Sequence, residues 1–216
     1  MSRTSALYHE ELYRTDAIMR TIRDLPVTIC GAGALGANIA ESLSRQGFGR
    51  LRVIDHDRVE QRNLSTQPYY RSDIGAGKAK ILAASLYRAL GVTVETRMET
   101  LGVSNAAKLL SGSALVIDAF DNSPARAAVT EYCRTSDTPC LHAGLANGYA
   151  EVLWNEGYRV PSPTNDDVCD YPLARNLVLL TVAVACECVV AWAAGGEKRG
   201  YTVTLGDLAV TPMPIT

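Results

Sequence analysis

The sequence GAGALG places Gly31, Gly33 and Gly36 in the GxGxxG spacing, between an apolar segment and an amphipathic one. Glycines at these positions allow a tight turn and a close approach of the backbone to phosphate, and the first amides of the following helix are oriented towards an anion. Asp55 ends the next apolar segment, where an acid can bind a ribose hydroxyl. These residues predict a nucleotide-binding site rather than a glycine-rich turn without a ligand.

The segment after Asp55 carries more polar side chains than a dinucleotide site requires. Residues 53–80 read VIDHDRVEQRNLSTQPYYRSDIGAGKAK. Four of them could bring amide donors and a cation to a further phosphate group: Asn63, Gln67, Gly75 and Lys78. The alternative for Lys78 is a solvated surface side chain. We interpret the acid, the polar segment and the lysine together as a site for a nucleoside triphosphate.

Two acids follow a buried strand further along the chain. The sequence VIDAFDN puts Asp118 and Asp121 at the end of an apolar run, and ligands of open α/β sheets bind at the carboxyl ends of the strands. An acid there could hold magnesium, which proteins bind through one or two carboxylates together with substrate phosphates. The alternative for Asp121 is helix capping, although we expect Ser123 to cap the next helix, with Pro124 in its first turn.

Strands and helices alternate around these motifs. Apolar runs predict strands at 26–30, 50–55, 92–98, 114–120, 139–145, 148–155 and 200–205. Helices are predicted after the glycine turn and at 77–90, 104–112, 123–135 and 177–194. This order favours an α/β fold with a doubly wound, mostly parallel, Rossmann-like sheet and an antiparallel extension at 139–154. We expect one domain over residues 1–216, with a helix or arm at 1–24 and a crossover loop at 155–176.

The composition excludes several classes of protein. With 21 basic and 23 acidic residues the net charge is −2, so a basic nucleic-acid surface is not expected. No secretory pattern precedes the first strand, and most of the six cysteines lie in apolar runs, so we expect a cytoplasmic protein with reduced cysteines. The sequence contains no pair of CxxC motifs, so a structural zinc site is not expected. Residues 177–194 are long enough to span a membrane, but Glu187 within them favours a buried helix.

The ordered motifs GAGALG, VIDHDRVEQRNLSTQ, DIGAGKAK and DAFDN resemble the adenylyltransferases that activate ubiquitin-like and sulfur-carrier proteins, the ThiF and MoeB enzymes. The resemblance covers roughly residues 13–195. It implies that ATP and Mg²⁺ activate the C-terminal glycine carboxylate of a β-grasp carrier protein as an acyl-adenylate, with release of pyrophosphate. It also implies a homodimer.

The resemblance assigns roles to particular residues. Asp55 would hold the ribose, Asn63 and Lys78 the phosphates, and Asp121 the magnesium. Asp57 lies beside them in the motif, and the glycine turn completes the nucleotide site. The family supplies an arginine from near the N-terminus across the dimer, for which Arg14 in LYRT is the matching residue.

Cys169, in the polar segment TNDDVCDYPLARN, stands where some members place a reactive cysteine. A helix N-terminus nearby would lower the pKa of its thiol, whereas three neighbouring acids would raise it: Asp166, Asp167 and Asp170. Cys169 therefore either takes the activated carboxyl or is an incidental loop cysteine in an enzyme that stops at the acyl-adenylate.

The chain departs from the family pattern at one phosphate-binding position. Thr66 stands where an arginine is expected, and Arg62 or Arg71 could compensate. The zinc-binding cysteine pairs and an inserted catalytic-cysteine domain are also missing from these residues. Two alternatives stay open: a tRNA-modifying dehydratase that adenylates a small carboxylate, and a non-catalytic partner of an activating heterodimer. A nicotinamide oxidoreductase leaves the segment from Asn63 to Lys78 unexplained.

Overall fold

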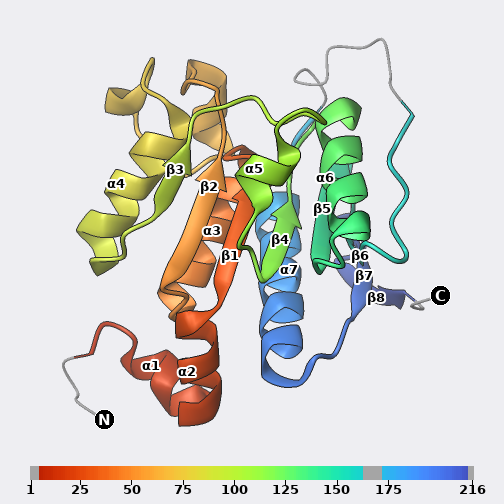
Figure 1. The fold of residues 1–216 in the computed structure, drawn as a ribbon. Helices are drawn as coiled ribbons and strands as arrows, with labels where there is room; N and C mark the ends of the chain where they lie inside the picture. Colours follow the sequence, from red (N-terminus) through yellow and green to blue (C-terminus); the bar gives the residue numbers. More distant parts are fainter. Residues whose placement is uncertain (1–4, 163–171, 214–216) are drawn as a thin grey trace.

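The computed structural model describes residues 5–162 and 172–213, and its sheet has eight strands in the order β3-β2-β1-β4-β5-β6-β7-β8 (Figure 1). Five neighbouring strands are parallel: β3 (Glu95–Arg97), β2 (Arg50–Ile54), β1 (Pro26–Cys30), β4 (Leu115–Asp118) and β5 (Cys140–Ala146). The chain runs from β1 outward to β3, then returns to place β4 on the other side of β1. The order therefore reverses between β1 and β4, which is where open α/β sheets bind ligands.

The antiparallel extension is longer than the sequence predicted. It consists of β6 (Tyr149–Trp154), β7 (Gly200–Thr204) and β8 (Ala209–Met213). Asn147 and Gly148 make the turn from β5 to β6 with positive φ angles of 56° and 117°. The strand β8 was not predicted, because it is almost entirely exposed and contains Pro212, so it lacks the apolar alternation of a half-buried strand.

Helices cover both faces of the sheet, which confirms the predicted doubly wound architecture (Figure 1). One face carries α3 (Ala34–Gln46), α4 (Lys78–Leu90) and α7 (Arg175–Gly195). The other carries α5 (Ala106–Leu110) and α6 (Ser123–Thr135). Each face buries its own apolar cluster against the parallel strands, so the strands between them are apolar on both sides, as their sequences predicted.

The N-terminal segment forms two helices, α1 (Tyr8–Tyr13) and α2 (Asp16–Asp24), at the end of the sheet away from the carboxyl ends of the parallel strands (Figure 1). The side chain of Thr15 caps α2 by accepting a hydrogen bond from the amide of Ile18. Met19 and Ile22 of α2 are buried in the core. This segment is therefore part of the fold and not a detached arm.

The apolar helix α7 packs against α3 and against strands β5, β6 and β7. It is long and apolar enough to cross a membrane by length and composition, and half of its apolar window is buried inside the protein. Its one acid, Glu187, forms an ion pair of 2.8 Å with Arg14. These contacts are those of a core helix, as expected from the sequence.

Candidate nucleotide site

The glycine turn lies directly after β1, at the point where the strand order reverses. Gly31 has a φ angle of +96°, which favours glycine, and its amide donates a hydrogen bond of 2.8 Å to the carbonyl oxygen of Ile54. A Cβ atom on Gly36 would lie 2.0 Å from the carbonyl oxygen of Gly31, so α3 can approach the turn only with glycine at this position. Gly33 is the N-cap of α3 and has open space around it, as close approach of a ligand requires.

Asp55 connects this turn to the end of β2. Its Oδ2 accepts a hydrogen bond of 2.6 Å from the amide of Ala32, and its Oδ1 accepts one of 2.7 Å from the amide of Asp57. Burial raises the pKa of the carboxyl above its usual value, although both amide donors act in the opposite direction. Tyr69 holds the same turn from another side, because its hydroxyl donates to the carbonyl oxygen of Ala32 at 2.8 Å.

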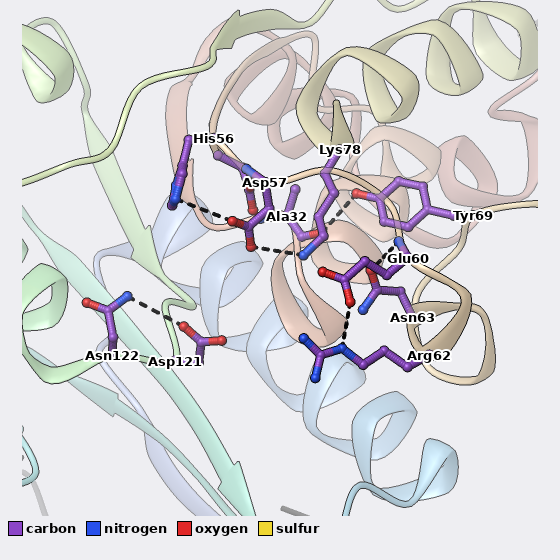
Figure 2. Close-up of polar contacts among 11 residues, drawn as sticks. Ala32, His56, Asp57, Glu60, Arg62, Asn63, Tyr69, Lys78, Asp121 and Asn122 are labelled. Carbon is purple, nitrogen blue, oxygen red and sulfur yellow. Dashed lines mark hydrogen bonds and ion pairs between the residues drawn. The ribbon is translucent and has the colours of Figure 1, made fainter. Parts of the chain in front are cut away.

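Lys78 is the first residue of α4, and its side chain lies towards the end of β2 (Figure 2). It is only 8% exposed, which excludes the alternative of a solvated lysine. Its Nζ is 3.1 Å from Oδ2 of Asp57, and Oδ1 of Asp57 is 3.3 Å from Nε2 of His56. The carboxylate of Asp57 is half exposed, so this cation and this anion meet at the surface of the site.

The segment between β2 and α4 forms two short 3-10 helices, η1 (Gln61–Ser65) and η2 (Arg71–Asp73). Oδ1 of Asn63 accepts a hydrogen bond of 2.9 Å from the amide of Glu60, so this side chain caps η1. Arg62, the residue before Asn63, forms an ion pair of 2.7 Å with Glu60 (Figure 2). Arg71 is an exposed residue of η2.

Thr66 and Gln67 are buried and serve the fold. The carbonyl oxygen of Thr66 accepts a hydrogen bond of 2.9 Å from Nδ2 of Asn38, which anchors the segment to α3. Gln67 lines a groove together with Arg45 and Arg175. The structure thus places Gln67 beside this groove and gives Thr66 a structural contact where the family has its arginine.

Asp121 lies in the four-residue loop between β4 and α6, and its side chain is exposed (Figure 2). This loop contacts the glycine turn, because a Cβ on Gly31 would be 3.1 Å from the carbonyl oxygen of Ala119. The cap of α6 is Asn122, whose Oδ1 accepts the amide of Ala125 at 2.9 Å. The predictions that Ser123 caps α6, or that Asp121 does, are therefore wrong.

Side chains that could hold a divalent cation follow β2 and β4. Asp55, His56 and Asp57, after β2, offer ligand atoms within 4.8 Å of one another, and Asp121 offers a further carboxylate from the loop after β4. Carboxylates are the ligands that Mg²⁺ prefers, and it is usually bound with substrate phosphates in addition. His56 is a residue that the sequence argument passed over between two acids.

A buried polar cluster behind the loop was also missed. Asp118, fully buried at the end of β4, lies 2.9 Å from Nδ1 of His142 and 3.6 Å from Nη1 of Arg126. The Arg126 side chain donates to the hydroxyl of Tyr158 at 3.0 Å, and the rings of Tyr158 and His142 stack with centroids 3.7 Å apart. Burial alone would raise the pKa of Asp118, but Arg126 and His142 hold it below its usual value. Asp118 is therefore an enclosed carboxylate and not an open metal ligand.

Two predicted site residues are not placed with the others. Arg14 directly follows α1, which lies at the opposite end of the sheet (Figure 1). Its side chain pairs with Glu10 and Glu187 at 2.8 Å each. Cys169 lies outside the described residues. The other five cysteines are buried: Cys30, Cys133, Cys140, Cys186 and Cys188.

A glycine turn at a strand-order reversal, with a buried lysine and several acids around it, is the arrangement that the nucleotide prediction requires. The chain matches the ThiF family over residues 6–190, and it belongs to that family. It is 37% identical over 136 residues to the SAMP-activating enzyme E1 of Haloferax volcanii, which covers 61% of this chain and 50% of that enzyme. The chain thus matches only half the length of that relative.

Solved structures agree with the fold. The E. coli tRNA N6-threonylcarbamoyladenosine dehydratase TcdA in complex with ATP superposes with a TM-score of 0.64 and 27% identity, over 66% of this chain and 60% of that one. E. coli MccB, solved with MccA, superposes with a TM-score of 0.83 over 100% of this chain and 72% of that one. At 15% identity, MccB shows the shared fold alone.

The close approach at Gly36 makes a prediction about stability. Gly36→Ala should lower the free energy of unfolding by about 3 kcal/mol, because the added methyl meets a backbone oxygen that cannot rotate away. Gly33→Ala is the matched control and should cost less than about 1 kcal/mol, since nothing lies within 4 Å of the new methyl. Urea unfolding measures both variants. Equal losses would contradict the close packing of α3 on the turn.

Proposed function

We propose that this protein uses ATP to adenylate the C-terminal glycine carboxylate of a ubiquitin-like or sulfur-carrier protein. The observation that carries the proposal is the buried Lys78 beside Asp57 at the carboxyl end of β2, next to the glycine turn. A buried cation beyond the glycine turn supplies counter-charge for the additional phosphate of a triphosphate. The membership of the ThiF family and the ATP complex of TcdA support the same nucleotide.

Each group of the site has a part in this reaction. The helix α3 begins after Gly33, where open space lets an anion approach its first amides, and Asp55 is placed to accept a ribose hydroxyl. The ammonium of Lys78 exchanges its contact with Asp57 for the phosphates, whose negative charge it stabilises as pyrophosphate leaves. Arg62, from η1, is the arginine we assign to the place of Thr66.

We assign magnesium to the carboxylates of this site. Asp121 would hold it, with Asp57 as a second oxygen ligand, and the ion would neutralise charge on the phosphates. Acyl-adenylate formation depends on positioning and charge stabilisation, so these residues meet its requirements without any zinc centre.

A second substrate class keeps the same chemistry. TcdA is a tRNA dehydratase by its name, and its likeness to this chain favours adenylation of a small carboxylate on an RNA as the alternative. The net charge of −2 argues for a protein carrier instead, because RNA binding depends on neutralising phosphates. Pyrophosphate exchange that responds to a small β-grasp protein encoded beside this gene, and not to tRNA, would decide for the carrier. A non-catalytic partner subunit would show no exchange with either.

The roles of Lys78 and Asp121 give the first test. Lys78→Ala and Asp121→Ala should each lower ATP–pyrophosphate exchange about 100-fold or more, because they remove the phosphate counter-charge and the metal ligand. Lys80→Ala is the matched control, since Lys80 lies in the same helix but is exposed. Circular dichroism should show all three variants folded. Wild-type exchange in the Lys78 variant would remove this lysine from the mechanism.

We also propose a homodimer in which Arg14 acts on the partner's nucleotide. Part of the apolar surface of α7 is left uncovered, including Leu179 at 42% exposure, and such surface favours association. Within one chain Arg14 is bound by Glu10 and Glu187, so acting across the interface requires these ion pairs to open.

Hybrid dimers test this arrangement. Arg14→Ala and Lys78→Ala should each be inactive alone, and a 1:1 mixture after subunit exchange should recover roughly a quarter of wild-type activity. Half of the dimers would then be hybrids, with one intact site of two. No recovery from proven hybrids would contradict a role across the interface, and a strict monomer by light scattering would exclude it.

We propose Cys169 as the acceptor of the activated carboxyl: its thiolate attacks the acyl-adenylate, a thioester to the carrier's C-terminal glycine forms, and AMP leaves. If the proposal holds, Cys169→Ala should keep ATP–pyrophosphate exchange, because adenylation precedes transfer to the thiol. The same variant should lose any covalent carrier adduct that a reducing agent cleaves, as mass spectrometry of the intact complex would show. Cys133→Ala, at a buried cysteine, serves as the control. An adduct that survives in Cys169→Ala would exclude this cysteine.

A further inference from the structure

The loop that carries Asp121 is closed by a side-chain contact between the residues on either side of it. Asp118 is the last residue of β4, and Arg126 lies in the first turn of α6. The Asp118 carboxylate accepts the amide of Phe120 at 3.2 Å through Oδ1, and its Oδ2 is 3.6 Å from Nη1 of Arg126. The loop 119–122 therefore lies between two buried groups that attract each other, Asp118 directly before it and Arg126 in the first turn of α6.

Arg126 joins this loop to two other parts of the fold. Its Nη2 donates a hydrogen bond of 2.8 Å to the carbonyl oxygen of Ala143 in β5, and its Nη1 donates to the hydroxyl of Tyr158 after β6. A guanidinium is planar and presents its donors in a fixed fork, so it sets the relative positions of the groups that it contacts. A lysine would supply the charge without this geometry.

Stability alone does not account for such a cluster. Removing a buried ion pair from water costs free energy, and a well-packed apolar group of the same size often stabilises as much or more. Arg126 also makes directional contacts with Ala143 in β5 and with Asp118 in β4, and these constrain where α6 lies relative to both strands.

We propose that Arg126 is a positioning residue that holds the loop 119–122, and thereby Asp121, in the place required for metal binding. The proposal rests on the proposed function for the role of Asp121, but the effect of Arg126 on the loop does not. The glycine turn and Asp55 lie on the other side of the loop and keep their own hydrogen bonds. Nucleotide affinity should therefore depend little on Arg126.

The test uses Arg126→Lys, with Arg52→Lys as the matched control. Arg52, in β2, also donates hydrogen bonds to backbone carbonyls, those of Leu109 and Ser111, but β1 and β4 separate β2 from β5. Hydrogen–deuterium exchange of the unliganded protein should be at least about tenfold faster at the loop amides in Arg126→Lys and unchanged there in the control. In pyrophosphate exchange, Arg126→Lys should raise the magnesium concentration for half-maximal rate about tenfold and lower kcat, with the KM for ATP within about twofold of wild type.

The outcomes separate the two claims. Loop exchange equal in both variants would overturn the positioning role, as would an unchanged magnesium dependence in an active Arg126→Lys enzyme. If hydrogen–deuterium exchange at the loop is faster in Arg126→Lys but the wild-type protein shows no pyrophosphate exchange, the action of Arg126 on the loop is supported and the proposed function is overturned. If Arg126→Lys does not fold, Tyr158→Phe replaces it, since it removes only the hydroxyl bound by Arg126. Unchanged loop exchange in that variant would then overturn the proposal.

Discussion

The two hydrogen bonds accepted by Asp55 are the constraint on which the rest of the site depends. One carboxylate fixes the amide of Ala32, in the glycine turn after β1, and the amide of Asp57, after β2. Because both bonds use backbone donors, the two loops cannot move independently. The buried carboxyl has a raised pKa, so the fold accepts an unfavourable charge at this point to keep the loops together.

The two sides of the site are held in different ways. On the side of β2, Lys78 and Asp57 are joined by a partly exposed ion pair that phosphate can replace. On the side of β4, a buried cluster of Asp118, Arg126 and His142 lies behind an exposed Asp121. The exchangeable contacts thus lie at the proposed nucleotide site, whereas the enclosed ones fix the backbone that presents them.

Sequence spacing could predict those parts of the site whose neighbours are close along the chain. The turn at Gly31, the acid after β2 and the lysine at the start of α4 follow from strand–turn–helix rules. The contact of Asp118 with His142 depends on β4 and β5 being adjacent in register, which no local pattern specifies. The exposed β8 gave no pattern because it lacks the apolar alternation of a half-buried strand. The cap of α6 was misplaced by one residue, although the bond from the amide of Ala125 to Asn122 is itself local.

A crystal structure of the protein with ATP and magnesium would test the central claim most directly. We predict the ribose at Asp55, the phosphates between the glycine turn and Lys78, and the metal at Asp121. Phosphates bound instead in the groove lined by Arg45 and Arg175 would contradict the assignment of the site.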